Sequence, residues 1–237
     1  VLDKLNKASE QVVSYKMDMN LDMSMDVDDL QLNIGAGVKS QVDLKRKRMY
    51  MQVGLKMLSL ETAVDYYYLD GCVYYNNPFT NEWFKKVMST QEYYELFDSN
   101  VSCKIMNAEE VLCAGLVIKE SEDSESLVLE GQVFLDEIYD SALGTSSSIG
   151  AINNTGITEK NDYFVRMQLD KETYLLESFH MSVKGKTVAG NGEVTNTTGD
   201  LKITYTDYNE KIELGLPANV INDATVVISS LKAMPRM

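Results

Sequence analysis

Residues 15–27 read YKMDMNLDMSMDV, and this stretch decides the fold. Seven apolar residues alternate with six polar ones, which is the period of a β-strand that has one apolar face and one solvated face. At about 3.3 Å per residue, the strand extends over roughly 40 Å. This length exceeds that of an ordinary strand and favours a large, curved sheet.

Further strands are predicted on both sides of this stretch. Asp70-Gly71 separates two alternating aromatic runs and predicts a tight hairpin, because both turn positions must accept a positive φ. Gly35–Gly37 is interpreted as a turn, and a β-bulge within Lys45–Arg48 accounts for a switch of apolar parity inside one strand over 38–53. The remaining predicted strands cover 60–69, 72–75, 116–118, 127–129, 163–169, 175–183, 201–205 and 212–216, with the last two paired to each other.

Short helices complete the prediction. Helical spacing of Leu2, Leu5 and Val12 indicates a helix over 1–13, and Ser89-Thr90-Gln91-Glu92 has the form of a capping box that opens a helix to about Phe97. Further helices are expected near 107–115, over 135–143 and around 226–231. Residues 144–161 are rich in Ser, Gly and Asn, so we expect a mobile loop there that acts as a lid over the concave face of the sheet.

The fold class is therefore α+β and mainly antiparallel β. No Pro- or Ser-rich linker divides the 237 residues, so we expect a single domain over 1–237, with a core over about 1–220 and a short C-terminal tail.

Composition and charge exclude several classes of function. The formal net charge of −14 argues against a nucleic-acid partner, and the run Lys45–Arg48 is interpreted as a solvated edge. Cys72, Cys103 and Cys113 lack metal-ligand spacing. Cys103 and Cys113 could form a disulfide, and buried free thiols are the interpretation we favour.

The sequence offers no recognisable catalytic or cofactor motif. It contains no GxSxG, GxGxxG, P-loop or HExxH, and His180 is the only histidine. The acidic cluster at Asp22, Asp26, Asp28 and Asp29 lacks the spacing of a Ca²⁺ loop. A glycosidase needs two paired carboxylates, and nothing singles out such a pair. We therefore expect a protein that is not an enzyme and needs no metal or cofactor.

Methionine and tyrosine are the residues that point to a function. Flexible thioether side chains on one face of a strand suit a surface that adapts to a variable apolar guest, and tyrosines suit its rim. The same methionines could instead fill an ordinary core, and the sequence leaves both interpretations open. The predicted cavity residues are Met17, Met19, Leu21, Met23, Met25, Met49, Met51, Tyr66, Tyr68, Tyr75, Trp83, Met167 and Met181.

The order of these features resembles the LolA-like (lipoprotein-carrier) superfamily, in particular its uncharacterised extracytoplasmic lipoproteins of Gram-positive bacteria. The matching features lie within about 1–220: the short helix before Tyr15–Met25, the hairpin over 66–75 leading to Trp83, Leu169–Tyr174, and 199–209 through Leu216-Pro217.

The resemblance implies an unclosed half β-barrel with a few short helices that cover its concave face. It implies a hydrophobic cavity for a lipid or acyl chain and no catalytic residues. A monomer is expected on the outer side of the cytoplasmic membrane, attached through a lipid anchor upstream of Val1. The alternative is a structural or sensory module of the cell envelope that binds a protein partner.

Overall fold

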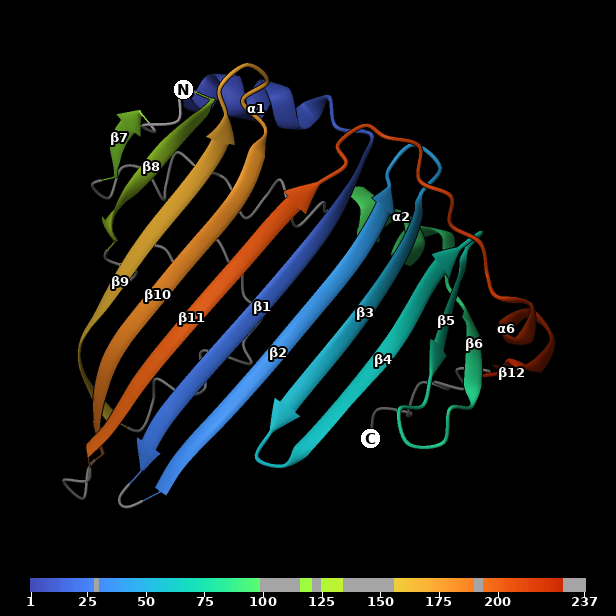
Figure 1. The fold of residues 1–237 in the computed structure, drawn as a ribbon. Coiled ribbons are helices and arrows are strands. Elements are labelled where there is room, and N and C mark those ends of the chain that lie inside the picture. Colours follow the sequence, from blue (N-terminus) through green and yellow to red (C-terminus); the bar gives the residue numbers. More distant parts are fainter. Residues whose placement is uncertain (28–29, 99–115, 121–124, 134–155, 190–193, 228–237) are drawn as a thin grey trace, which may run out of the picture.

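The alternating stretch forms strand β1 (Ser14–Val27), which lies in the middle of one large sheet (Figure 1). The structure is a computed structural model. It describes residues 1–27, 30–98, 116–120, 125–133, 156–189 and 194–227. Within these ranges the sheet has 12 strands in the order β12-β6-β5-β4-β3-β2-β1-β11-β10-β9-β8-β7. Neighbouring strands are antiparallel except for β12 and β6, which are parallel.

The remaining strands surround β1 on both sides. Their bounds are β2 (Leu30–Asp43), β3 (Arg48–Met57), β4 (Leu60–Leu69), β5 (Cys72–Asn76), β6 (Trp83–Val87), β7 (Val117–Glu120), β8 (Ser126–Val133), β9 (Gly156–Asp170), β10 (Leu176–Ala189), β11 (Val194–Thr206) and β12 (Thr225–Val226). In the described part of the chain the sheet does not close into a barrel, because β12 and β7 form its two edges. The observed architecture is the predicted unclosed, mainly antiparallel sheet.

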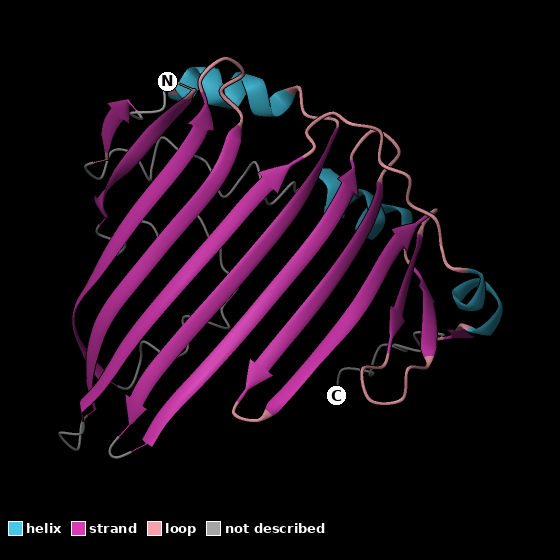
Figure 2. Cartoon of the chain, viewed as in Figure 1, coloured by secondary structure: helices cyan, strands magenta, loops and turns pink. Residues whose placement is uncertain are grey.

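Three short helices accompany the sheet in the described ranges (Figure 2): α1 (Leu2–Glu10), α2 (Thr90–Asp98) and α6 (Ala218–Asp223). Leu5 of α1 and Tyr93 and Phe97 of α2 join the same core as Tyr15 of β1. These two helices therefore cover the face of the sheet that carries Tyr15, which we call the inner face. The opposite face is the outer face. None of the described helices is long and apolar enough to cross a membrane.

Several local predictions are confirmed. Asp70 and Gly71 have φ values of 52° and 79° and connect β4 to β5 in a two-residue hairpin. The capping box forms at the start of α2, where Ser89 donates its backbone N–H to Glu92 Oε2 at 3.0 Å and Glu92 donates its own to Ser89 Oγ at 3.2 Å. The strands predicted at 116–118 and 127–129 correspond to β7 and β8, which pair antiparallel.

The predicted bulge in the basic run is wrong. Residues 44–47 form the turn between β2 and β3, with Lys47 at a φ of 52°. A second switch of parity, at Met57-Leu58, falls at the turn between β3 and β4, where Leu58 has a φ of 56°. Both switches of parity therefore mark hairpins, in which the chain reverses direction and begins a new strand.

The turn predicted at Gly35–Gly37 is also wrong. These residues lie inside β2, where Gly35 pairs with Asp22 and Gly37 with Asn20 of β1. The register between β1 and β2 runs without interruption from Ser14↔Asp43 to Val27↔Leu30. This continuous ladder outweighs the weak strand preference of glycine.

The C-terminal half departs from prediction in three places. Residues 212–216 form no strand, because β11 is already paired with β1 on one side and β10 on the other. Residues 156–161 belong to β9 and not to a loop. Val226 belongs to β12, and α6 was not predicted. The helices expected at 107–115 and 135–143, the rest of the expected lid (144–155), residues 228–231, Cys103 and Cys113 lie outside the described residues.

Candidate functional site: the inner face of the sheet

The strand registers place the predicted cavity residues relative to one another. Residues that are paired across two antiparallel strands project from the same face of the sheet. Tyr15 pairs with Val42 of β2, and both belong to the core under α1 and α2. From this row, every second residue along a strand, together with its paired residues on the neighbouring strands, lies on the inner face. Twelve of the thirteen predicted residues lie there: Met17, Met19, Leu21, Met23, Met25, Met49, Met51, Tyr66, Tyr68, Tyr75, Met167 and Met181.

Trp83 lies on the outer face. It pairs with Asn76, whereas the next residue, Phe84, pairs with the inner-face Tyr75. The Trp83 ring instead lies 5.9 Å from that of Tyr67, and Tyr67 lies 4.8 Å from Tyr50. The structure therefore separates Trp83 from the other predicted residues. No strand was predicted at Trp83, so alternation could not assign its face, and a shift of one residue along a strand reverses the face to which a side chain points.

Near α1 and α2 the inner face is a packed core. Met167 is 2% exposed and belongs to the buried cluster. Met17, Met19, Met49, Tyr68 and Met181 are partly buried and pack against that cluster. In this half of the inner face the methionines fill the core.

Toward the turn between β3 and β4 the inner face becomes open. Leu55, Met57 and Leu60 occupy consecutive inner-face positions of β3 and β4, and their exposed fractions are 52%, 47% and 51%. Leu21, Met23, Met25, Met51, Tyr66 and Tyr75 are partly buried and lie outside the core cluster. The apolar surface thus continues from the core into a region that the described residues leave partly uncovered.

Aromatic rings line the inner face along β4 to β6. The Tyr66 ring lies 6.4 Å from that of Tyr68 and 6.1 Å from that of Tyr75, which lies 5.5 Å from Phe84. These separations are typical of stacked aromatic pairs. Burial raises the pKa of the Tyr68 hydroxyl above its usual value, so this phenol is neutral across the physiological range.

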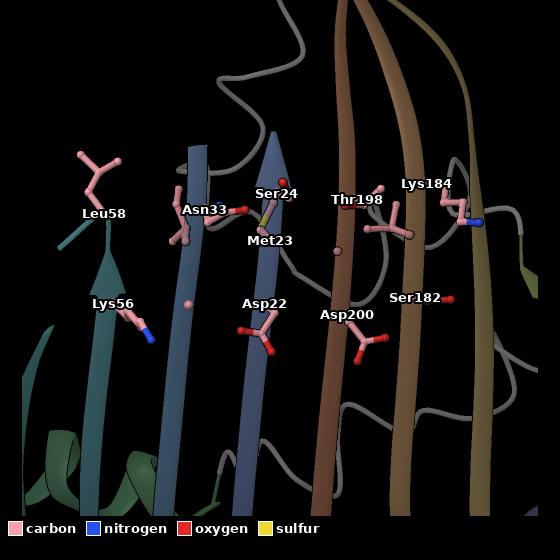
Figure 3. Close-up of a pocket in the computed structure, with 14 residues that line it drawn as sticks. Asp22, Met23, Ser24, Asn33, Lys56, Leu58, Ser182, Lys184, Thr198 and Asp200 are labelled. Carbon is pink, nitrogen blue, oxygen red and sulfur yellow. The ribbon is translucent and has the colours of Figure 1, made fainter. Parts of the chain in front are cut away.

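A pocket of about 550 Å³ lies toward the open end of the central strands (Figure 3). Its lining includes the apolar inner-face residues Met23, Ile34 and Val183. Most of its lining residues, however, occupy outer-face positions: Asp22, Ser24, Asn33, Ser182, Lys184, Thr198 and Asp200 are among them. The pocket is therefore lined mainly by residues of the outer face and is distinct from the apolar surface of the inner face.

Charged residues are segregated to the outer face. Along the described lengths of β1, β2, β3, β4 and β11, the registers place every Asp, Glu, Lys and Arg on that face, and they place Lys184 and Lys186 of β10 there as well. His180 and Asp200 meet there, with Nε2 and Oδ2 2.7 Å apart, and this contact lowers the pKa of Asp200. The central inner face thus offers no ionic partner to a ligand.

Sequence reasoning missed one kind of inner-face group, the hydroxyls of Ser40 and Thr62. Neither oxygen is exposed to solvent, and neither has a hydrogen-bond partner. Ser40 pairs with Met17 on one side and Met51 on the other. The alternation of apolar residues in the sequence could not identify Ser40 and Thr62, because it does not show which hydroxyls lack hydrogen-bond partners.

The described residues contain no group of three His, Cys, Asp or Glu side chains that could hold a metal ion. Cys72 is a free, partly buried thiol on β5.

Comparison with known proteins identifies a family. The model of a family of unknown function (DUF6612) matches residues 1–112 and 144–225. No curated protein matches the chain.

Solved structures to which the chain shows a weak likeness include lipovitellin, studied for its lipid–protein interactions, with 10% identity and a TM-score of 0.44. That match covers 86% of this chain but 26% of the other, so this chain spans about a quarter of lipovitellin. A DUF1329 family protein from Desulfovibrio piger shares 9% identity, over 90% of this chain and 93% of that one, with a TM-score of 0.25. A β-barrel-like DUF1849 protein from Brucella abortus shares 11%, over 83% and 100%, with a TM-score of 0.26.

Proposed function

We propose a function for this chain, which belongs to the family of unknown function DUF6612: it binds a hydrophobic ligand against the inner face of its half-barrel sheet. The observation that carries this proposal is the open half of the inner face. Leu55, Met57 and Leu60 expose about half of their surface next to a continuous apolar face. Contiguous exposed apolar surface of this kind marks a binding site in soluble proteins.

The two interpretations of the methionines apply to different parts of the face. Those near α1 and α2 contact the core, as the buried Met167 does. Met23, Met25 and Met57 lie toward the open end and outside the core cluster. Unbranched thioether side chains can change rotamer at little cost, which suits them to a guest of variable shape.

We extend the proposal to the setting of the protein. It binds its ligand without catalysis, as a monomer, outside the cytoplasm and attached to the membrane through a lipid on an upstream residue. The support is the resemblance of its ordered motifs to the LolA-like superfamily, such as the strand Tyr15–Met25 and the Asp70-Gly71 hairpin. Metabolic labelling of cells with a radioactive fatty acid tests the anchor, and a protein that remains unlabelled and cytoplasmic would overturn this extension.

Native mass spectrometry of gently purified protein tests the ligand proposal. Wild-type protein should carry a co-purified apolar molecule that denaturation releases. Met57→Glu should abolish this signal, because it places a carboxylate on the open inner face at a position that is already 47% exposed and tolerates a polar side chain. Lys56→Glu is the matched control, since it places the same carboxylate on the outer face of β3.

Two outcomes would count against the proposal. One is wild-type protein that carries no apolar molecule and takes up none from lipid vesicles. The other is a Met57→Glu variant that retains the ligand as well as Lys56→Glu does.

The outer face supports a second candidate function. Tyr50, Tyr67 and Trp83 form a partly exposed aromatic patch on β3, β4 and β6. Aromatic residues on an otherwise polar face are enriched in protein-binding sites. If the protein is an interaction module, Tyr67→Ala together with Trp83→Ala should abolish crosslinking to a membrane partner and leave ligand content unchanged. Crosslinking that is unaffected by this double substitution would exclude the patch.

A further inference from the structure

Ser40 presents a buried hydroxyl that has nothing to bind. It lies on the inner face of β2, is 5% exposed, and its Oγ has no hydrogen-bond partner, sulfur acceptors included. Its opposite residues on the neighbouring strands are Met17 of β1 and Met51 of β3. Burying a hydroxyl without a partner costs stability that an alanine at the same position would not.

The position of Ser40 makes it reachable by a ligand. Ser40 is a short side chain between two long ones, because Met17 and Met51 are its opposite residues on the neighbouring strands. Methionine has three rotatable bonds and no branch, so both side chains can move aside when an apolar molecule binds. The orphan hydroxyl would then gain a partner that the unliganded chain does not supply.

The surroundings define which partner fits. Among the described residues of β1 to β4 and β11, the charged side chains project from the outer face, so these strands would supply no counter-ion to a carboxylate or phosphate at Ser40. A saturated hydrocarbon would leave the hydroxyl unpaired. An uncharged acyl carbonyl oxygen satisfies the hydroxyl and carries no charge into the apolar face.

We propose that Ser40 Oγ donates a hydrogen bond to an uncharged acyl carbonyl of the bound ligand, so that the ligand is an acyl ester and not a free fatty acid or a hydrocarbon. This inference rests on the proposed function and deepens it. Ser40 thereby fixes the depth at which the ester group lies, while the acyl chain runs over the methionines toward the open half of the face.

The test uses two lipids that differ only in the carbonyl oxygen: palmitoyl-lysophosphatidylcholine, which is ester-linked, and its O-hexadecyl ether analogue. Each displaces a fluorescent naphthylamine probe from the full chain. Wild-type protein should bind the ester about five- to tenfold more tightly than the ether, the effect of one neutral hydrogen bond. Ser40→Ala should bind both lipids equally, and Ser40→Thr, which keeps a hydroxyl, should retain the preference.

Thr62→Val is the matched control, because it removes the other orphan inner-face hydroxyl, opposite Leu55. It should leave the preference for the ester unchanged. Without ligand, Ser40→Ala should unfold at the same or a higher temperature than wild type, since it removes an unpaired buried group.

The outcomes separate the two proposals. If neither the probe nor either lipid binds wild-type protein, the ligand-binding function itself fails. If both lipids bind but wild type shows no preference, or Ser40→Ala keeps it, the role of Ser40 is overturned and the binding function stands.

Discussion

Gly199 occupies an inner-face position of β11 where one methyl group would collide with its neighbours. A Cβ built there lies 2.7 Å from Val183 Cγ1 and 3.7 Å from Met23 Cγ. Val183 is β-branched and cannot easily rotate away. The glycine therefore leaves the space that the Val183 side chain occupies beside Met23.

We predict that Gly199→Ala destabilises the protein by about 1–3 kcal/mol, although alanine is usually the better residue in a strand. Gly54→Ala is the control, because the nearest atom to its added Cβ is a backbone oxygen at 3.8 Å. Gly54→Ala should be neutral or slightly stabilising. Urea unfolding of the two variants and wild type measures both effects, and equal midpoints for the two variants would contradict the prediction.

At the scale of elements, α1 is held to the sheet by a small number of apolar side chains. Leu5 is 3% exposed and belongs to the core together with Val12, which follows the helix. Leu5→Ala should cost about 2–4 kcal/mol, because the space it leaves lies between the helix and the sheet. Lys7 lies on the solvated side of α1. Lys7→Ala should therefore lower the free energy of unfolding by less than about 0.5 kcal/mol, as is usual for surface substitutions. Thermal unfolding of both variants checks the prediction, which fails if their midpoints coincide.

The turn between β9 and β10 depends on the carboxylate of Asp170. Its Oδ1 accepts hydrogen bonds from the backbone N–H of Thr173 at 2.6 Å, from Thr173 Oγ1 at 2.7 Å and from the backbone N–H of Glu172 at 3.1 Å. The bonds from Thr173 are the main cause that lowers the pKa of Asp170 below its usual value of 3.8. Because this pKa is lower in the folded chain, the ionised carboxylate stabilises the fold at pH values above the usual pKa of 3.8. This contribution to stability is lost as the pH falls below 3.8.

Asp170→Ala should therefore lower the free energy of unfolding by about 0.5–1.5 kcal/mol at pH 7 and by less at pH 3. Asp170→Asn keeps an acceptor oxygen and should lose less than Asp170→Ala at pH 7. Urea midpoints at the two pH values provide the measurement. A difference between wild type and Asp170→Ala that is the same at pH 3 and pH 7 would show that the charge plays no part.

Local patterns in the sequence were enough to predict most of the strands, but not β6 or β12 and not all of the connections. The alternation over 15–27 predicts β1 and its two faces, and Asp70-Gly71 predicts a hairpin, because both depend on neighbouring residues only. Gly35–Gly37 was misread because pairing with β1, a tertiary effect, decides its conformation. The predicted partner of β11 was wrong for the same reason, since its partner β1 lies near the other end of the sequence.

The candidate site shows the same division. Parity along each strand places the methionines and Tyr66, Tyr68 and Tyr75 on one face, as the registers confirm. Parity could not place Trp83, because β6 was not predicted and its pairing with β5 sets the face of each residue. Ser40 could not be recognised at all, because a missing hydrogen-bond partner is a property of the folded surroundings.

At the scale of the whole molecule, the central strands β1 to β4 and β11 separate an apolar face from a charged one, and the part of the apolar face toward the turn between β3 and β4 is only partly covered. A ligand that binds the folded sheet and not the unfolded chain must stabilise the fold. At a free concentration 100-fold above Kd, the gain is about 2.7 kcal/mol, which should raise Tm by roughly 5–10 °C for a chain of this size.

Thermal scans of wild type with increasing ester-linked lipid test this expectation. Met57→Glu should show little or no rise, because its carboxylate lies on the open inner face. A rise in Met57→Glu equal to that in wild type would place the binding site elsewhere.

The pairing of β1 with β11 also has a consequence for biosynthesis. Met17 is opposite Tyr205, so the central ladder joins residues that are 188 positions apart (205 − 17). While the chain is still being made, β1 can pair with β2 but its other edge stays unsatisfied until the C-terminal strands emerge. Contacts of such long sequence separation slow folding, and until they form, the unpaired strand edge is prone to aggregation. The nascent chain should therefore depend on chaperones that shield this edge, long after its first hairpin has formed.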